Sequence, residues 1–247
     1  MKNTLVLAAL IFTPALFAQF GPPPGPPKPP KTIAPIDLTG YWVSIVTEDW
    51  RFRMIAAPKG DFEGVPLNPA GQKIAKDWDP AKDEAAGNQC KAYGAAGLMR
   101  LPTRLHITWT DDNTLKIETD AGTQTRILHF GPPQTPTGAP TLQGYSVAQW
   151  LGPGGATPLF DPSNGGSLEV NTSHLAPGYL RRNGVPYSDK TTVTEYYDVI
   201  KEPEADWLIV KTIVNDPQYL IGRFITSTHF RKQPDAAGWK PSACYDR

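Results

Sequence analysis

The sequence lacks the short motifs that mark the most common enzyme classes. Its 247 residues contain no GxSxG, HExxH, P-loop or GxGxxG pattern, which disfavours α/β hydrolases, zinc proteases and nucleotide-dependent enzymes. It has no excess of charge of one sign, because 24 Lys and Arg balance 24 Asp and Glu, so we expect no nucleic-acid partner. No segment repeats at the periods typical of solenoids and propellers, which argues against both architectures.

Long apolar runs are also missing. The N-terminal stretch from Leu5 to Phe17 follows a basic residue and is too short for a confident membrane span. This layout is typical of a secretory signal peptide, here cleaved after Ala18; an N-terminal membrane anchor is the alternative. The segment 21–35 contains eight prolines and predicts an extended spacer without a core.

These features divide the chain into three parts: a signal peptide (1–18), a proline-rich linker (19–36) and one β-domain (37–247). The last part is long enough to bury a core of its own. We therefore expect a periplasmic or secreted protein without a stable membrane anchor. The sequence does not indicate an oligomeric state.

Cysteine is scarce, with only Cys90 and Cys244 in the chain. Exported proteins meet oxidising conditions, so a disulfide between the two is the expected state. Such a bridge would stabilise the fold by about 5 kcal/mol at most in the loop-entropy model. Two buried free thiols are the alternative.

What the sequence does contain is a series of short β-type segments. Residues 104–130 predict a meander of three strands with tight turns, and 184–231 predict three more strands in succession. Asn68-Pro69 predicts the start of one short helix over 69–79. Further strands are expected at 41–46, 50–55, 142–150 and 168–175. The fold class is therefore mainly β, as a single antiparallel barrel or strongly bent sheet of about nine or ten strands.

The four histidines, His106, His129, His174 and His229, all fall in or at the end of predicted strands. Three of them can line one interior, where imidazoles from separate strands would bind a metal or act as a base. A structural role, in which each histidine bonds its own neighbour, is the simpler interpretation. We assign no metal and no cofactor.

Other polar residues are candidates for a site in the same half of the chain. Glu195 lies in the middle of a predicted strand, where a buried carboxylate needs a counter-charge from Arg126 or Arg181; we favour Arg126. Without such a partner its pKa would rise and it would act as an acid or base. The predicted catalytic residues are Glu195, His229 and His174, and the predicted ligand contacts are Tyr145, Tyr187, Ser188 and Arg126.

Several short pieces occur in a fixed order along the folded part of the chain. They are Asp37–Trp42, Cys90 with Tyr93-Gly94 and Met99, the 104–130 meander, Gly144–Ser146 with Trp150, Leu168–Thr172, Gly184 with Pro186–Ser188, Thr194-Glu195, Asp216-Pro217 and Cys244. In this order they resemble a large family of uncharacterised exported bacterial proteins. The resemblance implies a lipocalin-like β-barrel and no settled activity. Family members often have a histidine where Tyr145 and Tyr187 stand here, so a histidine mechanism at these two positions does not transfer to this chain.

Three functions follow as hypotheses. The leading one is a barrel that binds a small apolar or aromatic ligand in its interior, because a barrel of this size has room for one such molecule. The second is a cofactor-independent lyase, isomerase or hydrolase that uses His and Glu or Tyr in the same cavity. The third is an envelope interaction protein in which the proline-rich segment is the functional part.

Overall fold

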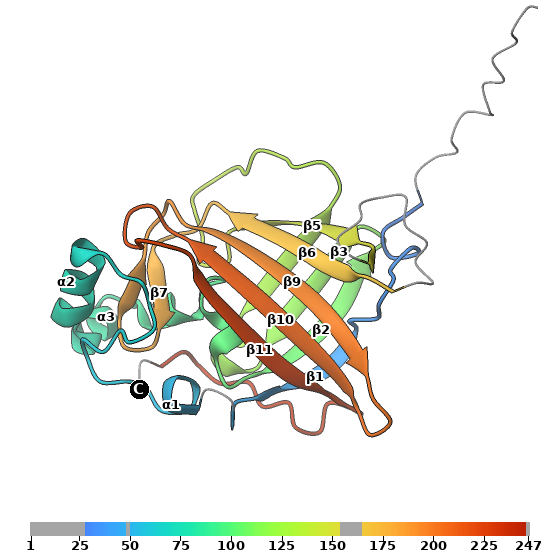
Figure 1. Cartoon of the computed structure of the whole chain (residues 1–247), viewed down its shortest axis with the longest axis horizontal. Coiled ribbons are helices and arrows are strands. Elements are labelled where there is room, and N and C mark those ends of the chain that lie inside the picture. The colour runs from blue at the N-terminus through green and yellow to red at the C-terminus, as the bar shows by residue number, and fades with distance from the viewer. Residues whose placement is uncertain (1–27, 48–49, 154–164, 246–247) are drawn as a thin grey trace, which may run out of the picture.

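The computed structural model describes residues 28–47, 50–153 and 165–245. The predicted signal peptide (1–18) and residues 19–27 of the linker lie outside the described residues. The remainder forms a β-barrel with a group of short helices at one end (Figure 1).

Nine strands close into the barrel in the order β1-β11-β10-β9-β6-β5-β4-β3-β2, which confirms the predicted barrel. The first strand pairs with the last, so no edge of the sheet is left between them. A separate two-stranded sheet is formed by β7 and β8. The strands are β1 (Gly40–Ile45), β2 (Arg104–Asp111), β3 (Thr114–Thr119), β4 (Thr125–Phe130), β5 (Tyr145–Leu151), β6 (Ser167–Ser173), β7 (Gly178–Arg181), β8 (Val185–Tyr187), β9 (Thr192–Lys201), β10 (Asp206–Asn215) and β11 (Phe224–Gln233).

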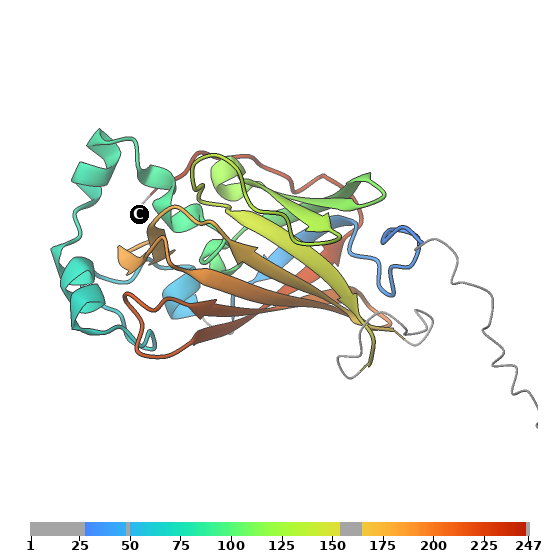
Figure 2. The same ribbon diagram turned by 90° about the horizontal axis from the view of Figure 1, so that it is seen from above.

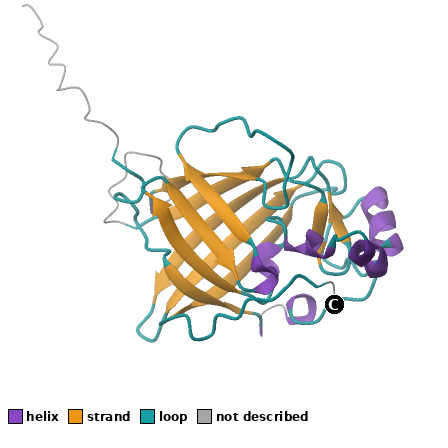
Figure 3. Ribbon diagram, turned by 180° about the vertical axis from the view of Figure 1, so that it is seen from behind, coloured by secondary structure: helices purple, strands orange, loops and turns teal. Residues whose placement is uncertain are grey.

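The barrel is mixed rather than purely antiparallel, which corrects the prediction. Strands β4 and β5 pair in parallel, with Leu128 opposite Ser146 and Phe130 opposite Ala148. A parallel pair needs a connection that returns along the whole length of the strands. The Gly- and Pro-rich stretch 131–144 makes this return, and it arches over the outside of the barrel (Figures 1 and 3).

The described residues contain more helices than the one predicted. The predicted helix at 69–79 is confirmed as α2, and its first turn is capped by the Asn68 side chain, which accepts a hydrogen bond from Gly71 N at 3.0 Å. The predicted strand at 50–55 is wrong, because Trp50–Arg53 is a helical turn. The helices are α1 (Trp50–Arg53), α2 (Pro69–Asp77), α3 (Pro80–Ala85), η2 (Gln89–Tyr93), η3 (Leu98–Arg100) and η4 (Ala121–Thr123).

Two apolar clusters fill and close the barrel. Alternate side chains of each strand point inward, and those nearer the β2–β3 turn pack into the first cluster. The second cluster joins α2 and the β7–β8 sheet to the other end of the barrel, which we call the helical end (Figure 2). The first cluster includes Trp42, Leu105, Ile107, Leu115, Leu128, Leu168, Tyr197, Leu208 and Phe230, and the second includes Leu67, Ala75, Leu180, Val185, Tyr187, Val193 and Phe224.

The opposite end, which we call the mouth, is covered by the segment 28–39. The backbone N–H of Lys31 donates to Asp112 O at 3.2 Å, and the Trp150 indole N–H donates to Pro30 O at 2.9 Å. Leu38 is buried against the barrel core. The described part of the predicted linker, residues 28–36, is therefore attached to the barrel rim and packs against its core, which corrects the prediction of an extended spacer for these residues.

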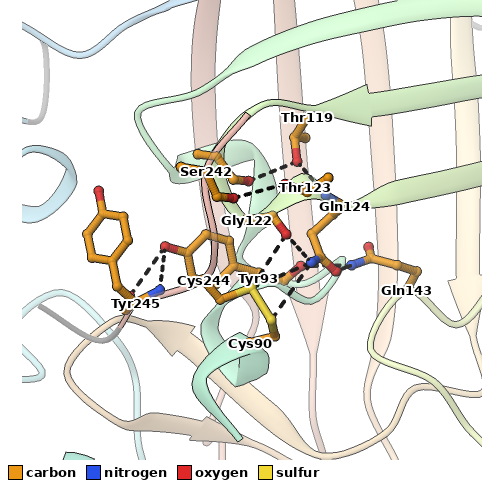
Figure 4. The surroundings of a disulfide bond; sticks show 11 residues. Cys90, Tyr93, Thr119, Gly122, Thr123, Gln124, Gln143, Ser242, Cys244 and Tyr245 are labelled. Atoms are coloured by element: carbon orange, nitrogen blue, oxygen red, sulfur yellow. Dashed lines mark hydrogen bonds between the residues drawn. A yellow bond between two sulfur atoms is a disulfide. The ribbon is translucent and has the colours of Figure 1, made fainter. Parts of the chain in front are cut away.

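The predicted disulfide is confirmed between Cys90 of η2 and Cys244 of the C-terminal tail (Figure 4). From the mouth, where β11 ends, the tail runs back along the barrel to the helical end. Nearby hydrogen bonds also hold it: Ser242 N donates to Asp120 O at 2.9 Å, and Thr123 Oγ1 donates to Ser242 O at 2.9 Å. The bridge thus fixes the end of the described chain to the η2 turn.

Candidate functional site

A charged pair lies inside the barrel, as the sequence predicted for Arg126 and Glu195. Both side chains are fully buried, and their contact is bidentate: Arg126 Nη1 donates to Glu195 Oε1 at 3.0 Å, and Nη2 donates to Oε2 at 2.6 Å. Arg126 is on β4 and Glu195 on β9, which are separated by two strands in the sheet. The pair therefore spans the interior of the barrel.

Three hydroxyl groups extend this pair into a network. Arg126 donates to Tyr197 Oη at 3.4 Å and to Thr172 Oγ1 at 3.3 Å, and Thr172 shares a hydrogen bond of 2.8 Å with Ser146. All five side chains point inward and are buried. Buried polar groups need such partners, since an unmade hydrogen bond costs free energy in the interior.

The electrostatics of the network keep the Arg126 guanidinium charged and the Tyr197 hydroxyl protonated. Burial alone lowers the pKa of Arg126, but the charge of Glu195 and the contact with Tyr197 outweigh burial, so that pKa is raised overall. The pKa of the Tyr197 hydroxyl is also raised, first by burial and then by the Glu195 carboxylate. Because both oxygens of Glu195 are held by the guanidinium, this carboxylate is a structural partner and is not exposed to a substrate.

The other two predicted catalytic residues do not join Glu195, so the predicted common lining is wrong. His229 is on β11 between the buried residues Thr228 and Phe230, and alternation turns it to the outer face. His174 follows β6 with a φ of +58° and approaches the crossover, where its Nε2 lies 3.1 Å from Gly138 O. Glu195 therefore points into the barrel, whereas both histidines lie on its outside.

The predicted ligand contacts are also dispersed. Tyr145 is on the outer face and stacks on His129 with ring centroids 5.2 Å apart. Ser188 is buried and tied to Asp216, whose Oδ2 accepts from Ser188 N at 2.7 Å and whose Oδ1 accepts from Ser188 Oγ at 2.8 Å. Neither residue belongs to the network of Arg126 and Glu195.

Tyr187 belongs to the apolar core of the helical end. Its hydroxyl is buried, and among the described residues it has no hydrogen-bond partner. Burial raises the pKa of this hydroxyl. Its surroundings are tight, because a Cβ placed on Gly94 would lie 2.1 Å from the hydroxyl oxygen.

The histidines do not form a metal centre in the part of the chain that the structure describes. No group of three or more His, Cys, Asp or Glu side chains is positioned there to hold an ion. His106 instead stacks on Tyr41 at 4.2 Å and lies 3.3 Å from a Glu118 oxygen. The alternative of a histidine metal site thus gains no support from these residues.

A pocket of about 620 Å³ opens at the mouth, between the barrel rim and the segment 28–39. We call it the mouth pocket. Trp109 and Val199 come from the ends of β2 and β9, where alternation turns them inward, and Ile36 closes the pocket from the N-terminal side. The complete lining is Lys31, Ala34, Pro35, Ile36, Asp37, Thr39, Trp109, Gly165, Val199 and Lys201.

Aromatic rings stand behind this pocket. Trp109 packs against Phe130 at 5.3 Å and against Trp150 at 6.4 Å, and the latter two are 5.4 Å apart. These rings join the pocket to the barrel core. The lining therefore combines one aromatic residue, Trp109, which is backed by two further rings, with apolar residues of the N-terminal segment.

The pocket rim carries two positive side chains, Lys31 and Lys201, and one negative side chain, Asp37. Lys31 and Lys201 have no ion-pair partner among the described residues, whereas the Asp37 carboxylate accepts hydrogen bonds from Thr39 N at 2.9 Å and Thr39 Oγ1 at 2.7 Å. Asp37 keeps its negative charge, with Oδ1 engaged in its own turn, so the two ammonium groups leave the rim with a net positive charge. The pocket is apolar at its base and cationic at its edge.

The sequence-based prediction missed the mouth pocket. The sequence does hold a signal for this pocket, which is the alternation of inward and outward residues in β2 and β9. It places Trp109 on the inner face with Leu105 and Ile107, and Val199 on the inner face with Tyr197. What the pattern does not reveal is that residues 28–39 fold back over these positions. That contact joins segments at least 70 residues apart in the chain.

Comparisons with known proteins give no relative: no family model, no curated protein and no solved structure matches this chain. The resemblance to exported barrel proteins thus stays a prediction. Among the described residues, none of the helices has the length and hydropathy that crossing a bilayer requires.

Proposed function

We propose that this protein is exported and binds a small, largely apolar or aromatic molecule that carries an acidic group, and that the mouth pocket is the site. The mouth pocket itself carries this proposal. Its volume of about 620 Å³ falls within the range of ordinary small-molecule sites, which are mostly apolar with a few polar groups that orient the ligand.

The chemistry of the lining favours an amphipathic ligand. Trp109 and Val199 offer apolar surface to a hydrocarbon or aromatic body. Lys31 and Lys201 are on the rim, where a carboxylate or sulfonate would form charge-assisted hydrogen bonds with them. The ligand would thus lie with its body toward Trp109 and its acidic group toward the lysines of the rim.

Export is supported by the disulfide between Cys90 and Cys244. Such bridges persist in oxidising compartments and are rare in the cytosol of most organisms. The predicted signal peptide and the resemblance to exported bacterial barrels point the same way, to the periplasm or the cell exterior. A functional role for the proline-rich segment concerns residues of which about half, 21–27, lie outside the described part.

An enzyme using the predicted acid and base has less support. Glu195 is held by Arg126 in the closed interior, whereas His174 and His229 are on the outside of the barrel. A general acid or base must come within hydrogen-bond reach of its substrate. The described positions of these three residues do not allow them to act on one molecule.

Titration with anilinonaphthalene sulfonate, an aromatic anion whose fluorescence rises in apolar surroundings, tests the proposal. We expect saturable binding to the folded protein and competition by dodecanoate. Lys201→Glu should weaken binding by roughly tenfold, since it replaces an attraction with a repulsion at the rim. Val199→Trp should reduce binding further, because it fills the pocket.

Two matched variants control for these changes. Lys240→Glu makes the same change of charge on the C-terminal tail, and Ile200→Trp adds a similar ring on the outer face, where Ile200 is 46% exposed. Both should bind the probe like the parent. Equal binding by Val199→Trp and the parent would place the probe elsewhere and overturn the proposal.

A further inference from the structure

A second hollow lies on the outer wall of the barrel, apart from the mouth pocket. It has a volume of about 570 Å³, and its floor is formed by the outer faces of β5, β6 and β9. Gly131 and Pro133, at the start of the β4–β5 crossover, form its side wall. We call this hollow the crossover groove.

The groove exists because β4 and β5 are parallel. Most neighbouring strands that follow each other in this barrel are joined by short turns, which leave the outer wall open. The 131–144 connection instead has to return along the barrel, and it stands over the strands as it does so (Figures 1 and 3). A convex barrel surface thereby acquires a concave site.

The crossover is held in place at both ends. Phe130 N donates to Asn113 O at 2.9 Å at its start. Near its end, Ala176 N donates to Thr141 O at 2.7 Å, and Gln143 Nε2 donates to Tyr93 O at 2.8 Å. The wall of the groove is therefore preformed, which lowers the entropic cost of binding a ligand there.

The floor of the groove is polar but carries no charge. The side chains that point outward into it from the three strands are amides and hydroxyls, together with Val147. None of the residues that line the groove is ionisable, although charged residues make up 19% of the chain. The polar side chains of the floor are Gln149, Asn171, Ser173, Thr192 and Thr194.

The Asn171 side chain is held in place on this floor by two hydrogen bonds. Its Oδ1 accepts a hydrogen bond from Thr194 Oγ1 at 2.8 Å, and its Nδ2 donates to Glu169 Oε1 at 2.6 Å. An amide has two donor hydrogens and two acceptor lone pairs, so one of each remains for a ligand. Gln149 and Ser173, on either side, have no side-chain partner among the described residues.

We propose that the crossover groove binds a short neutral saccharide. Each sugar hydroxyl both donates and accepts hydrogen bonds, which matches side chains that do the same. Val147 and Pro133 offer apolar contact to the C–H faces of a sugar ring. An acidic or basic ligand would find no counter-charge among the residues of the lining, and the adjoining Glu169 carboxylate is engaged by Asn171 Nδ2. The groove therefore favours uncharged molecules.

A panel of neutral trisaccharides (maltotriose, cellotriose, xylotriose and chitotriose) tests this inference. Binding to the full-length mature protein is followed by backbone amide shifts, which locate the contact. We expect at least one of the four to shift the amides of β5, β6 and β9. Asn171→Ala should weaken that binding roughly tenfold, as expected for the loss of one or two neutral hydrogen bonds.

The controls separate this site from the mouth pocket. Ser227→Ala removes a hydroxyl from the outer face of β11 and should leave saccharide binding unchanged, as should Lys201→Glu. If none of the four sugars binds, or if binding is the same in Asn171→Ala, the inference is wrong. Preferential binding of a charged saccharide or of a peptide would also overturn it, whatever the result at the mouth.

Discussion

The buried pair of Arg126 and Glu195 makes a demanding prediction about stability. In Glu195→Gln the guanidinium keeps its charge inside the barrel but loses its counter-ion. In Arg126→Met the carboxylate is left in the same position. Each single change should therefore lower the free energy of unfolding strongly, because an uncompensated charge remains among fully buried groups.

The expected magnitude follows from the burial of the pair. Breaking a buried ion pair by removing one partner costs about 3–5 kcal/mol. For a domain of this size, each kcal/mol shifts the melting temperature by about 2–4 °C, so either single variant should melt roughly 6–20 °C below the parent. The combined variant Arg126→Met with Glu195→Leu removes both charges, and we expect it to lie within about 2 kcal/mol of the parent.

Urea unfolding followed by tryptophan fluorescence measures all four proteins, and Trp42 in the barrel core provides an internal reporter. The double-mutant cycle should give a coupling free energy of at least about 3 kcal/mol. Additive effects of the two single changes would show that the pair is not coupled. A loss below about 1 kcal/mol in both single variants would refute the view that the interior is closed to water.

The remaining predictions concern groups of the helical end. Tyr187→Phe should equal or exceed the parent in stability, since it removes a buried hydroxyl without a partner among the described residues; a loss above about 2 kcal/mol in urea unfolding would contradict this. The raised pKa of the Tyr187 hydroxyl keeps it protonated in the folded state above about pH 10, where unfolded tyrosines ionise. Unfolding then releases a proton, so stability should fall as pH rises through this range, by up to about 1.4 kcal/mol per pH unit for this group, and the fall should be shallower in Tyr187→Phe. Replacing Cys90 and Cys244 together by serine should lower the free energy of unfolding by up to about 5 kcal/mol, measured against the oxidised parent; unchanged stability would mean that the bridge only anchors the tail.

The sequence predicted the barrel because strand signals are local. The segment from Phe224 to Phe230 alternates between two faces, and the structure places Phe224, Thr228 and Phe230 inside. The meander at 104–130 was predictable for the same reason, since tight-turn residues separate its strands. Local patterns did not reveal that β4 and β5 pair in parallel, because strand order depends on a long connection.

Tertiary contacts overrode local preference at residues 50–55. Trp50 and Ile55 favour strands, yet this stretch begins with a helical turn. Arg53 is buried there and donates to Ile45 O at 2.7 Å and to Arg100 O at 3.0 Å. Contacts to residues 47 positions away have no signal in a local window.

The predicted site failed on side-chain direction rather than on residue type. Glu195 and Arg126 were correctly expected to pair, because a buried charge requires a partner. His229 alternates with residues that turned out to face inward, and the pattern alone does not say which face is the inner one. His174 lies beyond the end of its strand, where alternation no longer applies.

The pairing of β1 with β11 has a consequence for the order of events in folding. The first strand obtains one of its two neighbours from the final strand, which lies more than 180 residues later in the chain. Until that strand is available, the edges of β1 and β10 have no permanent neighbour and can pair with other chains. The ribosome releases β1 long before β11, so the barrel cannot close while the chain is still being synthesised. A factor that keeps the chain extended until it is complete would protect it during this interval.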